Sequence, residues 1–537
     1  MRDEKRDDTA TTSVTGDSVK EIPKNQSNYL QAESNTSSLT LPPSSLTLWL
    51  DRLIIFWLFV MAAFAPHSIA VTQGAWLFGL ILWSVRLLVK PRPRLYRTPV
   101  DFALWGFIVL TFISSIFSYA PDISFGKMRA ASLFIIVYMV AENVTSMRLV
   151  RLLVLTLIAS CMVNVLYTFG ERAVGRGVKV EGLQVSSPLY TAGIQNGDTI
   201  LNVDDRKLST PEELVKALDA PADGSNRDAA RVQVYHFEAM PTFKVARGSL
   251  LAGQTALERL GIGSWSRGRD WRAAGFYGHY VTYAEMLQLV ASLAFGLFIA
   301  LRRKLSLQGV LLALVVAGMC GALLLTVTRA SLGAFLLSSF VIVIVGASRR
   351  AILVMLACAL PLALLGLFLL QQKRNVSFLD PKDDSINWRK TVQREGFNLL
   401  TSKPRHLVVG VGMDSIKRYW REWGLFEGGR IPMGHMHSNL LQLALERGVP
   451  ALVFWLALVF VYARHLWRLA RKGQVKDWIE RGLILGALGG LAGFFTSGLV
   501  HYNFGDSEDV MILYFIMGLC LVVEREVRKK RLDGDDE

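Results

Sequence analysis

Three basic residues stand beside long apolar runs, where an ionisable side chain needs either a nearby interface or a purpose. Arg329 lies in LLLTVTRASLGAFLL, Arg272 in RDWRAAGFYGHYVTYAEML, and His437 in GHMHSNLLQLALERG. A charge at the centre of a membrane span costs about 2.5 to 3.5 kcal/mol on insertion scales. Arginine binds anions through its planar fork, and histidine exchanges a proton near neutral pH. Anion binding and proton transfer are therefore the chemistry that these residue types could perform.

The composition predicts that these residues belong to a polytopic membrane protein. Of 537 residues, 52% are hydrophobic and 19% are charged, so the chain has more apolar surface than a soluble core would bury. A helix needs about 20 apolar residues to cross a bilayer. On that basis the candidate spans are 46–65, 69–88, 100–119, 128–143, 149–169, 280–301, 307–327, 331–347, 350–371, 445–464, 481–499 and 508–523.

The basic residues predict the orientation of these spans. The net charge of +15 would point to nucleic acid in a soluble protein, but here the cations concentrate in alternate connections between spans. The clusters are 90–97, 302–304, 348–350, 464–476 and 524–531. The positive-inside rule places them and both termini in the cytoplasm, and it places segments 170–279 and 372–437 on the far side.

Arg272, Arg329 and His437 all fall on that far side, so we expect them to converge on one face of the membrane. The alternative is that each one is an ordinary interfacial anchor that snorkels into the lipid head groups.

The terminal segments and the cysteines indicate no further chemistry. Residues 1–45 are polar and lack the order of a signal peptide, so we predict a disordered cytoplasmic tail there and a second tail over 526–537. The four cysteines fall inside predicted spans without metal-ligand spacing, so we expect them to be packing residues. They are Cys161, Cys320, Cys358 and Cys520. We predict no metal and no cofactor.

Residues 170–275 differ in character from the spans on either side. In GVKVEGLQVSSPLYTAGIQNGDTILNVDDRKLSTPEELVKAL, short β-rich runs alternate with turn signals, and Thr210 precedes a proline and two acidic residues as a helix cap would. We predict a small α/β module. Its order resembles a PDZ domain of the kind attached to bacterial envelope proteases, which implies that a peptide strand adds to an open sheet edge.

The nearest candidate for a carboxylate-binding loop in this module is Gly182-Leu183-Gln184-Val185. The alternative is a degenerate module that only spaces or braces the membrane part.

The second long segment carries a more specific pattern. SINWRKTVQREGFNLL is followed by Lys403-Pro404, by Gly410-Val411-Gly412, by His437-Ser438 and, ten residues after Ser438, by Gly448. This order resembles the C-terminal signature of the O-antigen ligase and O-antigen polymerase superfamily, which also includes bacterial protein O-oligosaccharyltransferases.

Three more stretches resemble this superfamily. TRASLGAFL and RAAGFYGHYVTYAEM resemble its two arginine-containing loops, with Arg329 and Arg272 in the arginine positions, and HYNFGDSEDVMILYFIMGL resembles the end of some ligase-like members. The likeness covers roughly 270–525. Ala451 departs from it, because the family usually has Gly, Thr or Tyr three residues after Gly448.

The resemblance implies a fold and a reaction. The fold is an all-α polytopic membrane protein of about twelve transmembrane helices, GT-C-like, with the small α/β PDZ-like insert between helices 5 and 6. Members transfer a glycan from undecaprenyl diphosphate to a hydroxyl acceptor at the periplasmic face of the bacterial inner membrane, with inversion and without a nucleotide sugar or bound metal.

The domains then follow the spans. They are transmembrane helices 1–5 (46–169), the PDZ-like domain (170–275), helices 6–9 (276–371), a periplasmic catalytic loop (372–437) and helices 10–12 (438–525).

The resemblance also implies residue roles. Arg272 and Arg329 would stabilise the leaving diphosphate, because arginine stays cationic and binds phosphate oxygens. His437 would take the acceptor proton, and His435 could substitute for it. A helix that starts just after His437 would lower its pKa and attract the diphosphate.

The helix after His437 is predicted to have a polar stripe. Ser438, Gln442 and Glu446 share one side, whereas a helical His437 would point about 150° away, so we expect His437 at or before the helix cap. The substrate-binding candidates are Ser438, Asn439, Gln442 and Glu446, with a solvated face as the alternative, together with Asp506 and Glu508 as partners of sugar hydroxyls or of the arginines.

Several functions remain open. The leading hypothesis is an O-antigen ligase that uses lipid A-core as the acceptor, and the alternatives within the superfamily are a polymerase that uses a second lipid-linked glycan and a transferase that uses a protein. From another class, a non-catalytic PDZ-bearing envelope sensor or a transporter competes. The two halves of the chain show no repeat and no matching pair of broken spans, which argues against a transporter.

Overall fold

The computed structural model describes residues 45–93, 95–220, 228–236, 240–349, 352–353, 384–431, 433–471 and 474–534. Residues 1–44 of the predicted disordered tail, almost all of the predicted span 350–371, and Cys358 lie outside these residues, whereas Ser45 begins the first described helix.

In the part of the chain that the structure describes, nine helical segments are long and apolar enough to cross a membrane. They are α2 (Ser45–Phe64), α3 (Ile69–Leu88), the joined α5, η1 and α6 (Pro121–Asn143), α7 (Met147–Val174), α11 (Tyr280–Ala300), α12 (Leu307–Leu325), α13 (Arg329–Gly346), α20 (Val449–Arg471) and α21 (Trp478–Ser497). This confirms a multi-pass helical membrane protein. The predicted number of twelve also counted α4 (Asp101–Ile116), which is apolar but shorter, α22 (Ser507–Gly534), and 350–371.

Some predicted boundaries differ from the structure. The predicted span 128–143 is a broken helix that begins earlier, as α5 (Pro121–Ala131), η1 (Ser132–Phe134) and α6 (Ile135–Asn143), because Pro121 occupies a helix-starting position. The predicted C-terminal tail from 526 continues α22 as a helix to Gly534, and Arg525 donates from this helix to the carbonyls of Ala141 and Val144.

The centre of the bundle is formed by α11 and α21, whose side chains are buried on nearly all sides. Glycines on α21 let the two backbones approach closely. A Cβ at Gly486 would lie 2.6 Å from the Leu293 Cα and 2.9 Å from the Ser292 carbonyl oxygen of α11. Small residues at helix contacts are typical of packing inside membranes, where the hydrophobic effect does not hold helices together.

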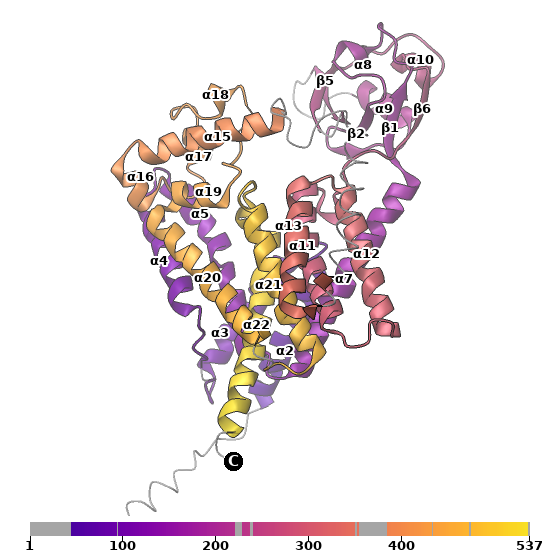
Figure 1. Ribbon diagram of the computed structural model, residues 1–537. Helices are drawn as coiled ribbons and strands as arrows, with labels where there is room; N and C mark the ends of the chain where they lie inside the picture. The colour runs from indigo at the N-terminus through magenta and orange to yellow at the C-terminus, as the bar shows by residue number, and fades with distance from the viewer. Residues whose placement is uncertain are drawn as a thin grey trace, which may run out of the picture.

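A small α/β module follows α7 and precedes α11 (Figure 1). Its antiparallel sheet has the strand order β5-β4-β2-β1-β6, and β3 pairs with β2. The elements are β1 (Arg176–Glu181), α8 (Pro188–Thr191), β2 (Thr199–Val203), β3 (Arg206–Lys207), α9 (Pro211–Asp219), β4 (Ala229–Tyr235), β5 (Thr242–Ala246), α10 (Ala256–Leu260) and β6 (Ser264–Gly268). The Thr210 hydroxyl accepts from the Glu213 N–H at the start of α9, as its sequence predicts.

Short helices occupy the segment that the sequence predicts as a loop. They are α15 (Asp384–Thr401), α16 (Pro404–Val409), α17 (Ile416–Tyr419) and α18 (Phe426–Gly429), and α19 (Asn439–Arg447) follows the predicted loop. They lie at the same end of the bundle as the α/β module, and α22 ends at the opposite end (Figure 1). We call this end the module end.

The chain turns sharply between α19 and α20. Gly448 has φ of +84°, and a Cβ there would collide with the carbonyl oxygen of Val408. A glycine is needed at this turn. The predicted span 445–464 therefore begins four residues later, at Val449.

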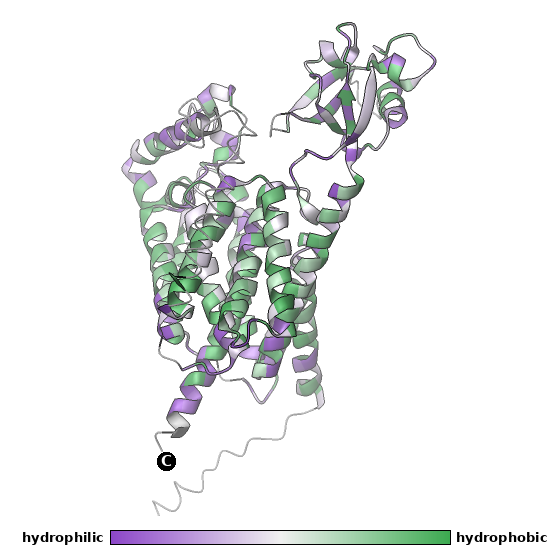
Figure 2. Cartoon of the chain, turned by 45° about the vertical axis from the view of Figure 1, so that its right-hand side comes forward, coloured by the Kyte–Doolittle hydropathy of each residue, from purple (hydrophilic) through white to green (hydrophobic). Residues whose placement is uncertain are grey.

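Hydropathy follows this arrangement. The helices of the bundle are mostly hydrophobic, whereas hydrophilic residues gather in the α/β module, in the short helices of the module end and toward the C-terminus of α22 (Figure 2). Large apolar side chains on the outside of the bundle are exposed, for example Phe102, Leu314 and Phe460, as expected for helices that face lipid.

The close approach of α11 and α21 predicts a large effect of one added methyl group. Gly486→Ala should destabilise the protein by about 1–3 kcal/mol, because the Leu293 backbone cannot move without shifting α11. Gly170→Ala is the matched control, because a Cβ at this glycine of α7 meets nothing within 4 Å. Thermal unfolding in detergent compares the two variants, and equal melting temperatures would contradict the packing described.

Candidate active site

Arg272 and Arg329 lie together at the module end. The Arg272 Nε donates to the Thr326 carbonyl (2.9 Å) and its Nη2 to the Val327 carbonyl (2.6 Å), in the turn that leads directly into Arg329 and α13. The guanidinium of Arg272 also lies 3.8 Å from the centroid of the Tyr280 ring. Burial lowers the pKa of Arg272, and the charge of Arg329 contributes to this shift.

His437 stands outside α19. Its φ is +48°, and Ser438 caps the helix by accepting from the Leu441 N–H (3.5 Å). This agrees with the expectation that the loop, and not the helix, sets the direction of His437. The ring of Trp388 on α15 meets His437 edge-on, with 4.3 Å between centroids.

His435 and His437, the two histidines of GHMHSNLLQLALERG, lie against each other. Their ring centroids are 4.2 Å apart, and the backbone N–H of His437 donates to Nδ1 of His435 (3.2 Å). In this arrangement His435 carries its own proton on Nε2. Nδ1 of His437 is buried and has no hydrogen-bond partner among the described residues.

Three histidines of this site are held neutral. Burial, with smaller contributions from the neighbouring His435, Arg389 and His501, lowers the pKa of His437 to about 2. Burial also lowers the pKa of His435 to about 4 and that of His501 to about 3. At neutral pH each ring is therefore uncharged and can accept a proton or a hydrogen bond.

Longer-range electrostatic effects also link the arginines to the histidines. Arg272 acts on His501, and His501 acts on His437. Arg272 and Arg389 thus both act electrostatically on histidines at this end of the bundle, and Arg329 acts on Arg272. We call Arg272, Arg329, Arg389, His435, His437 and His501 the basic group.

The sequence did not assign roles to Arg389 and His501. Arg389 lies on α15 next to Trp388, and His501 lies between α21 and α22 and is 7% exposed. Both belong to stretches that carry the family resemblance, NWRK and HYNFG. The family resemblance could therefore have pointed to both residues. The sequence did not predict the packing that brings α15 and the α21–α22 connection close to the two histidines.

The polar stripe of α19 points into the protein. Ser438, Asn439, Gln442 and Glu446 are each 8% exposed or less, so the alternative of a solvated face is wrong. Asn439 donates from Nδ2 to Oδ1 of Asn503 (2.6 Å), and its own Oδ1 accepts from the Phe504 N–H (3.2 Å).

Glu446 and Gln442 connect α19 to the histidine loop. Oε1 of Glu446 accepts from the Asp414 N–H (3.0 Å) and from Nε2 of Gln442 (2.8 Å). Oε1 of Gln442 accepts in turn from the N–H of Met436 (2.7 Å), the residue between the two histidines. Tyr502 donates to Oε2 of Glu446 (3.4 Å) and packs against His435. Glu446 thus holds Gln442, which in turn binds the backbone between the two histidines.

A second buried carboxylate, that of Glu285 on α11, connects the ends of α13 and α21 that lie near the site. It accepts from the hydroxyls of Ser331 (2.9 Å) and Ser497 (2.6 Å) and from Nδ2 of Asn503 (3.1 Å). Because Asn503 also binds Asn439, this network joins α11, α13 and α21 to α19. Glu285 lies in the stretch RAAGFYGHYVTYAEM that carries the family resemblance, but its spacing indicated no role.

Asp506 and Glu508 lie at the start of α22, and neither forms an ion pair with the described residues. Oδ2 of Asp506 accepts from the Thr282 hydroxyl (3.4 Å), which also bonds Nδ1 of His279 (3.0 Å). Burial raises the pKa of Asp506 to about 7, and the neighbouring Glu508 and Glu285 contribute to this rise. Asp506 therefore titrates near neutral pH.

The candidate peptide loop Gly182 to Val185 lies in the α/β module, between β1 and α8. Two of its backbone donors are already used, because the Leu183 N–H binds Oδ1 of Asn196 (3.3 Å) and the Gln184 N–H binds the Gly261 carbonyl (2.9 Å). The Val185 side chain is 76% exposed.

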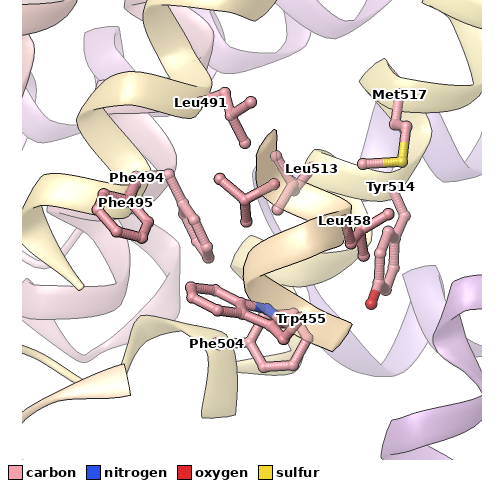
Figure 3. Close-up of a pocket in the computed structure, with 10 residues that line it drawn as sticks. Trp455, Leu458, Leu491, Phe494, Phe495, Phe504, Leu513, Tyr514 and Met517 are labelled. Carbon is pink, nitrogen blue, oxygen red and sulfur yellow. The ribbon is translucent and has the colours of Figure 1, made fainter. Parts of the chain in front are cut away.

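An apolar pocket lies between α20, α21 and α22 (Figure 3). The pocket is narrow, with room for about one water molecule. Its lining residues are Trp455, Leu458, Val459, Leu491, Phe494, Phe495, Phe504, Leu513, Tyr514 and Met517. It contains no member of the basic group.

Comparison with known families bears on this site. Residues 314–456 match the family model described as O-Antigen ligase, a range that includes Arg329, Arg389 and His437 but not Arg272. No curated protein matches the chain. The family match supports the O-antigen ligase superfamily and, with the apolar helices, a glycan-transferring enzyme of the membrane.

The hydrogen bonds of Glu446 predict that the stability of the folded protein depends strongly on its two carboxylate oxygens. Glu446→Ala leaves three donors without their partner, those of Asp414, Gln442 and Tyr502, at roughly 1–3 kcal/mol for each donor that water cannot reach. Glu446→Gln keeps one acceptor oxygen and should cost much less. Melting temperatures measure both, with the exposed Glu422→Ala as the control, and a Glu446→Ala variant as stable as this control would contradict the network.

The low pKa of His501 predicts a loss of stability in acid. The pKa is about 3 in the folded protein and about 6.5 in an unfolded chain, so between these values the unfolded state binds more protons. Stability then falls as the pH falls through this window, by at most about 1.4 kcal/mol per pH unit for one histidine. Melting temperatures at pH 7 and pH 5 should differ less in His501→Asn than in the wild type, and an equal difference would contradict this assignment.

Proposed function

We propose that this protein transfers a glycan from undecaprenyl diphosphate to a hydroxyl acceptor, at the module end of the helix bundle and on the periplasmic face of the bacterial inner membrane. The observation that supports the proposal is that Arg272 binds the turn leading into Arg329, and that His437, between α18 and α19, belongs to the same end of the bundle. The family match over 314–456 supports the same class of reaction.

The leaving group is the first demand of this reaction. When the bond between the anomeric carbon and the diphosphate oxygen breaks, its electron pair leaves with the diphosphate, which gains negative charge. Arg272 and Arg329 stabilise that charge, because a guanidinium remains cationic and matches phosphate geometry. The carbonyls of Thr326 and Val327 fix the direction of Arg272 before the donor arrives, so little reorganisation is needed.

The acceptor proton is the second demand. As the acceptor oxygen bonds to the anomeric carbon, its proton passes to the imidazole of His437. Burial keeps this ring neutral in the free protein. The negative charge of a bound diphosphate raises the proton affinity of His437, so the base becomes competent when the donor is in place. His435 lies beside this base, and its Nδ1 accepts a hydrogen bond from the His437 backbone N–H.

The polar stripe has a positioning role in this proposal. Ser438, Asn439, Gln442 and Glu446 bind the protein itself and hold His437 at its left-handed backbone position. Asp506 and Glu508 remain the candidates for contact with acceptor hydroxyls. Asp506 is the better of the two, because its hydrogen bond to Thr282 places it near His279.

The acceptor distinguishes three versions of the proposal. Lipid A-core is our first choice, since residues 501–519 resemble the end of ligase-like members, and a second lipid-linked glycan or a protein are the alternatives. The α/β module, if it acts as a PDZ-like domain, would bind a peptide near Gly182 to Val185.

A non-catalytic sensor or a transporter is the alternative from another class. The geometry favours catalysis, because a buried network of Glu446, Gln442 and Tyr502 is dedicated to holding two histidines with uncharged rings beside arginines. A sensor has no need of such a base.

Substitutions test the proposal in cells that display the glycan. His437→Ala should reduce transfer at least about a hundredfold, the usual size of general-base catalysis, and Arg329→Ala should do the same through the leaving group. Both should leave the protein level unchanged. His465→Ala, at the opposite end of α20, is the matched histidine control.

Surface glycan on lipopolysaccharide gels and the protein amount on immunoblots provide the two readouts. Full transfer by His437→Ala would exclude the mechanism. Full transfer by both His437→Ala and Arg329→Ala would favour the sensor or the transporter.

A further inference from the structure

The connection that leads out of the α/β module reaches Arg272 through Trp271. The Trp271 side chain is 1% exposed and belongs to a small apolar cluster with Leu201 of β2 and with Ala273. Leu325, the last residue of α12, packs against the same cluster. The module, the connection and the helix bundle therefore meet at Trp271, directly before Arg272.

Trp271 also joins the two connections of the module to each other. The chain enters the module from α7 and leaves it toward α11 (Figure 1). Two arginines of the entrance lie over the Trp271 ring, with Arg176 at 5.1 Å and Arg172 at 5.9 Å from its centroid. At the exit, Nε1 of Trp271 donates to the carbonyl of Gly268, the last residue of β6 (3.3 Å). Cations bind the face of a tryptophan ring, so Trp271 holds the entrance of the module against its exit.

The backbone on both sides of Arg272 is fixed to membrane helices. The Trp271 carbonyl accepts from Nη1 of Arg172 on α7 (2.7 Å), and the Ala273 N–H donates to the Leu325 carbonyl of α12 (2.9 Å). Because both neighbours of Arg272 are held in this way, the position of Trp271 sets the direction in which the Arg272 side chain leaves the backbone.

The Arg272 side chain in turn holds a strained turn. It donates to the carbonyls of Thr326 and Val327, and Val327 has φ of +53°, which a β-branched residue rarely adopts. Such a conformation persists only where the surrounding structure enforces it. Arg329 begins α13 two residues later, so a shift of Arg272 would also change the position of Arg329.

We propose that Trp271 is a positioning residue for Arg272, and that through it the α/β module becomes part of the diphosphate site. This role of Trp271 rests on that of Arg272 in the proposed function. Trp271 fixes the guanidinium before the donor binds, so that less reorganisation is needed during the reaction. A module that only spaces or braces the membrane part would have no effect on the work of one arginine.

A double-mutant cycle in the purified full-length protein tests this role. Trp271→Ala, Arg272→Ala and the double variant are compared in liposomes that contain the undecaprenyl-diphosphate-linked glycan and lipid A-core. Arg272→Ala should slow transfer about a hundredfold. Trp271→Ala should slow it at least about tenfold, because a guanidinium displaced by about 1 Å loses much of its effect. The double variant should match Arg272→Ala within about twofold, because Trp271 has nothing to position once Arg272 is absent.

Three further variants complete the test. Trp271→Phe keeps an aromatic ring for the arginines and should retain most of the transfer. Arg172→Gln removes the donor to the Trp271 carbonyl, so it should show the same non-additivity with Arg272→Ala, and it decides the question if Trp271→Ala does not fold. Trp265→Ala is the matched control, because Trp265 packs against the core of the module and not in the cluster of Trp271, and its transfer should equal that of the wild type.

Two results would overturn the positioning role. Wild-type transfer by folded Trp271→Ala would remove it, and a double variant slower than Arg272→Ala by the full factor of Trp271→Ala would leave Trp271 with a purely structural role.

Absence of transfer by the wild type would instead contradict the proposed function. The same cycle, measured as binding of undecaprenyl diphosphate by native mass spectrometry, then judges the positioning alone. No weakening by the double variant beyond that of Arg272→Ala would support it, and weakening that multiplies, or none in Trp271→Ala, would contradict it.

Discussion

The buried carboxylate of Glu446 is the interaction on which the module end depends. Its side chain holds the backbone of Asp414, and its own backbone carbonyl accepts from the Gly412 N–H (2.9 Å) and from the Ser114 hydroxyl of α4 (2.8 Å). Through Gln442 it also fixes Met436. A carboxylate with this many donors satisfies polar groups that would otherwise be buried without partners, and it joins segments that are distant in the sequence.

This constraint explains two features of the chain around it. Gly410 has φ of +73°, and a Cβ there would lie 2.5 Å from the Glu446 carbonyl, so only glycine allows the loop to approach. His437 takes up a left-handed backbone conformation that a histidine adopts only when its surroundings enforce it. The cost of that conformation is met by the hydrogen bonds of its neighbours, and the result is an imidazole whose direction is set before any substrate binds.

Burial gives the basic group its chemical character. The imidazoles lose their charge when they are removed from water, whereas the guanidinium groups keep theirs, so one site contains neutral proton acceptors beside permanent cations. A reaction that releases a diphosphate and a proton together requires this combination. Glu285 adds to it by fixing the ends of α11, α13 and α21 through Ser331, Ser497 and Asn503.

Much of the fold could be predicted from local pattern, and much of the site could not. Apolar length predicts α2, α3, α7 and α11 within a few residues, and the Thr210 cap predicts α9. The helical periodicity of α19 correctly places His437 outside the helix. It does not predict whether the polar stripe of α19 contacts water or protein. That depends on Asn503 and Asp414, which come from distant segments. The roles of Arg389 and Glu285 were not predicted for the same reason, because these roles arise from tertiary packing and not from the spacing of residues in the sequence.

The most direct measurement is transfer by the purified protein in liposomes that contain an undecaprenyl-diphosphate-linked glycan and one hydroxyl acceptor at a time. Lipid A-core, a second lipid-linked glycan and a peptide are offered in parallel, and the product is identified by mass spectrometry. The account predicts glycan on lipid A-core, with release of undecaprenyl diphosphate and with loss of the product in His437→Ala. Absence of product from all three acceptors by a folded protein that retains its donor would contradict it.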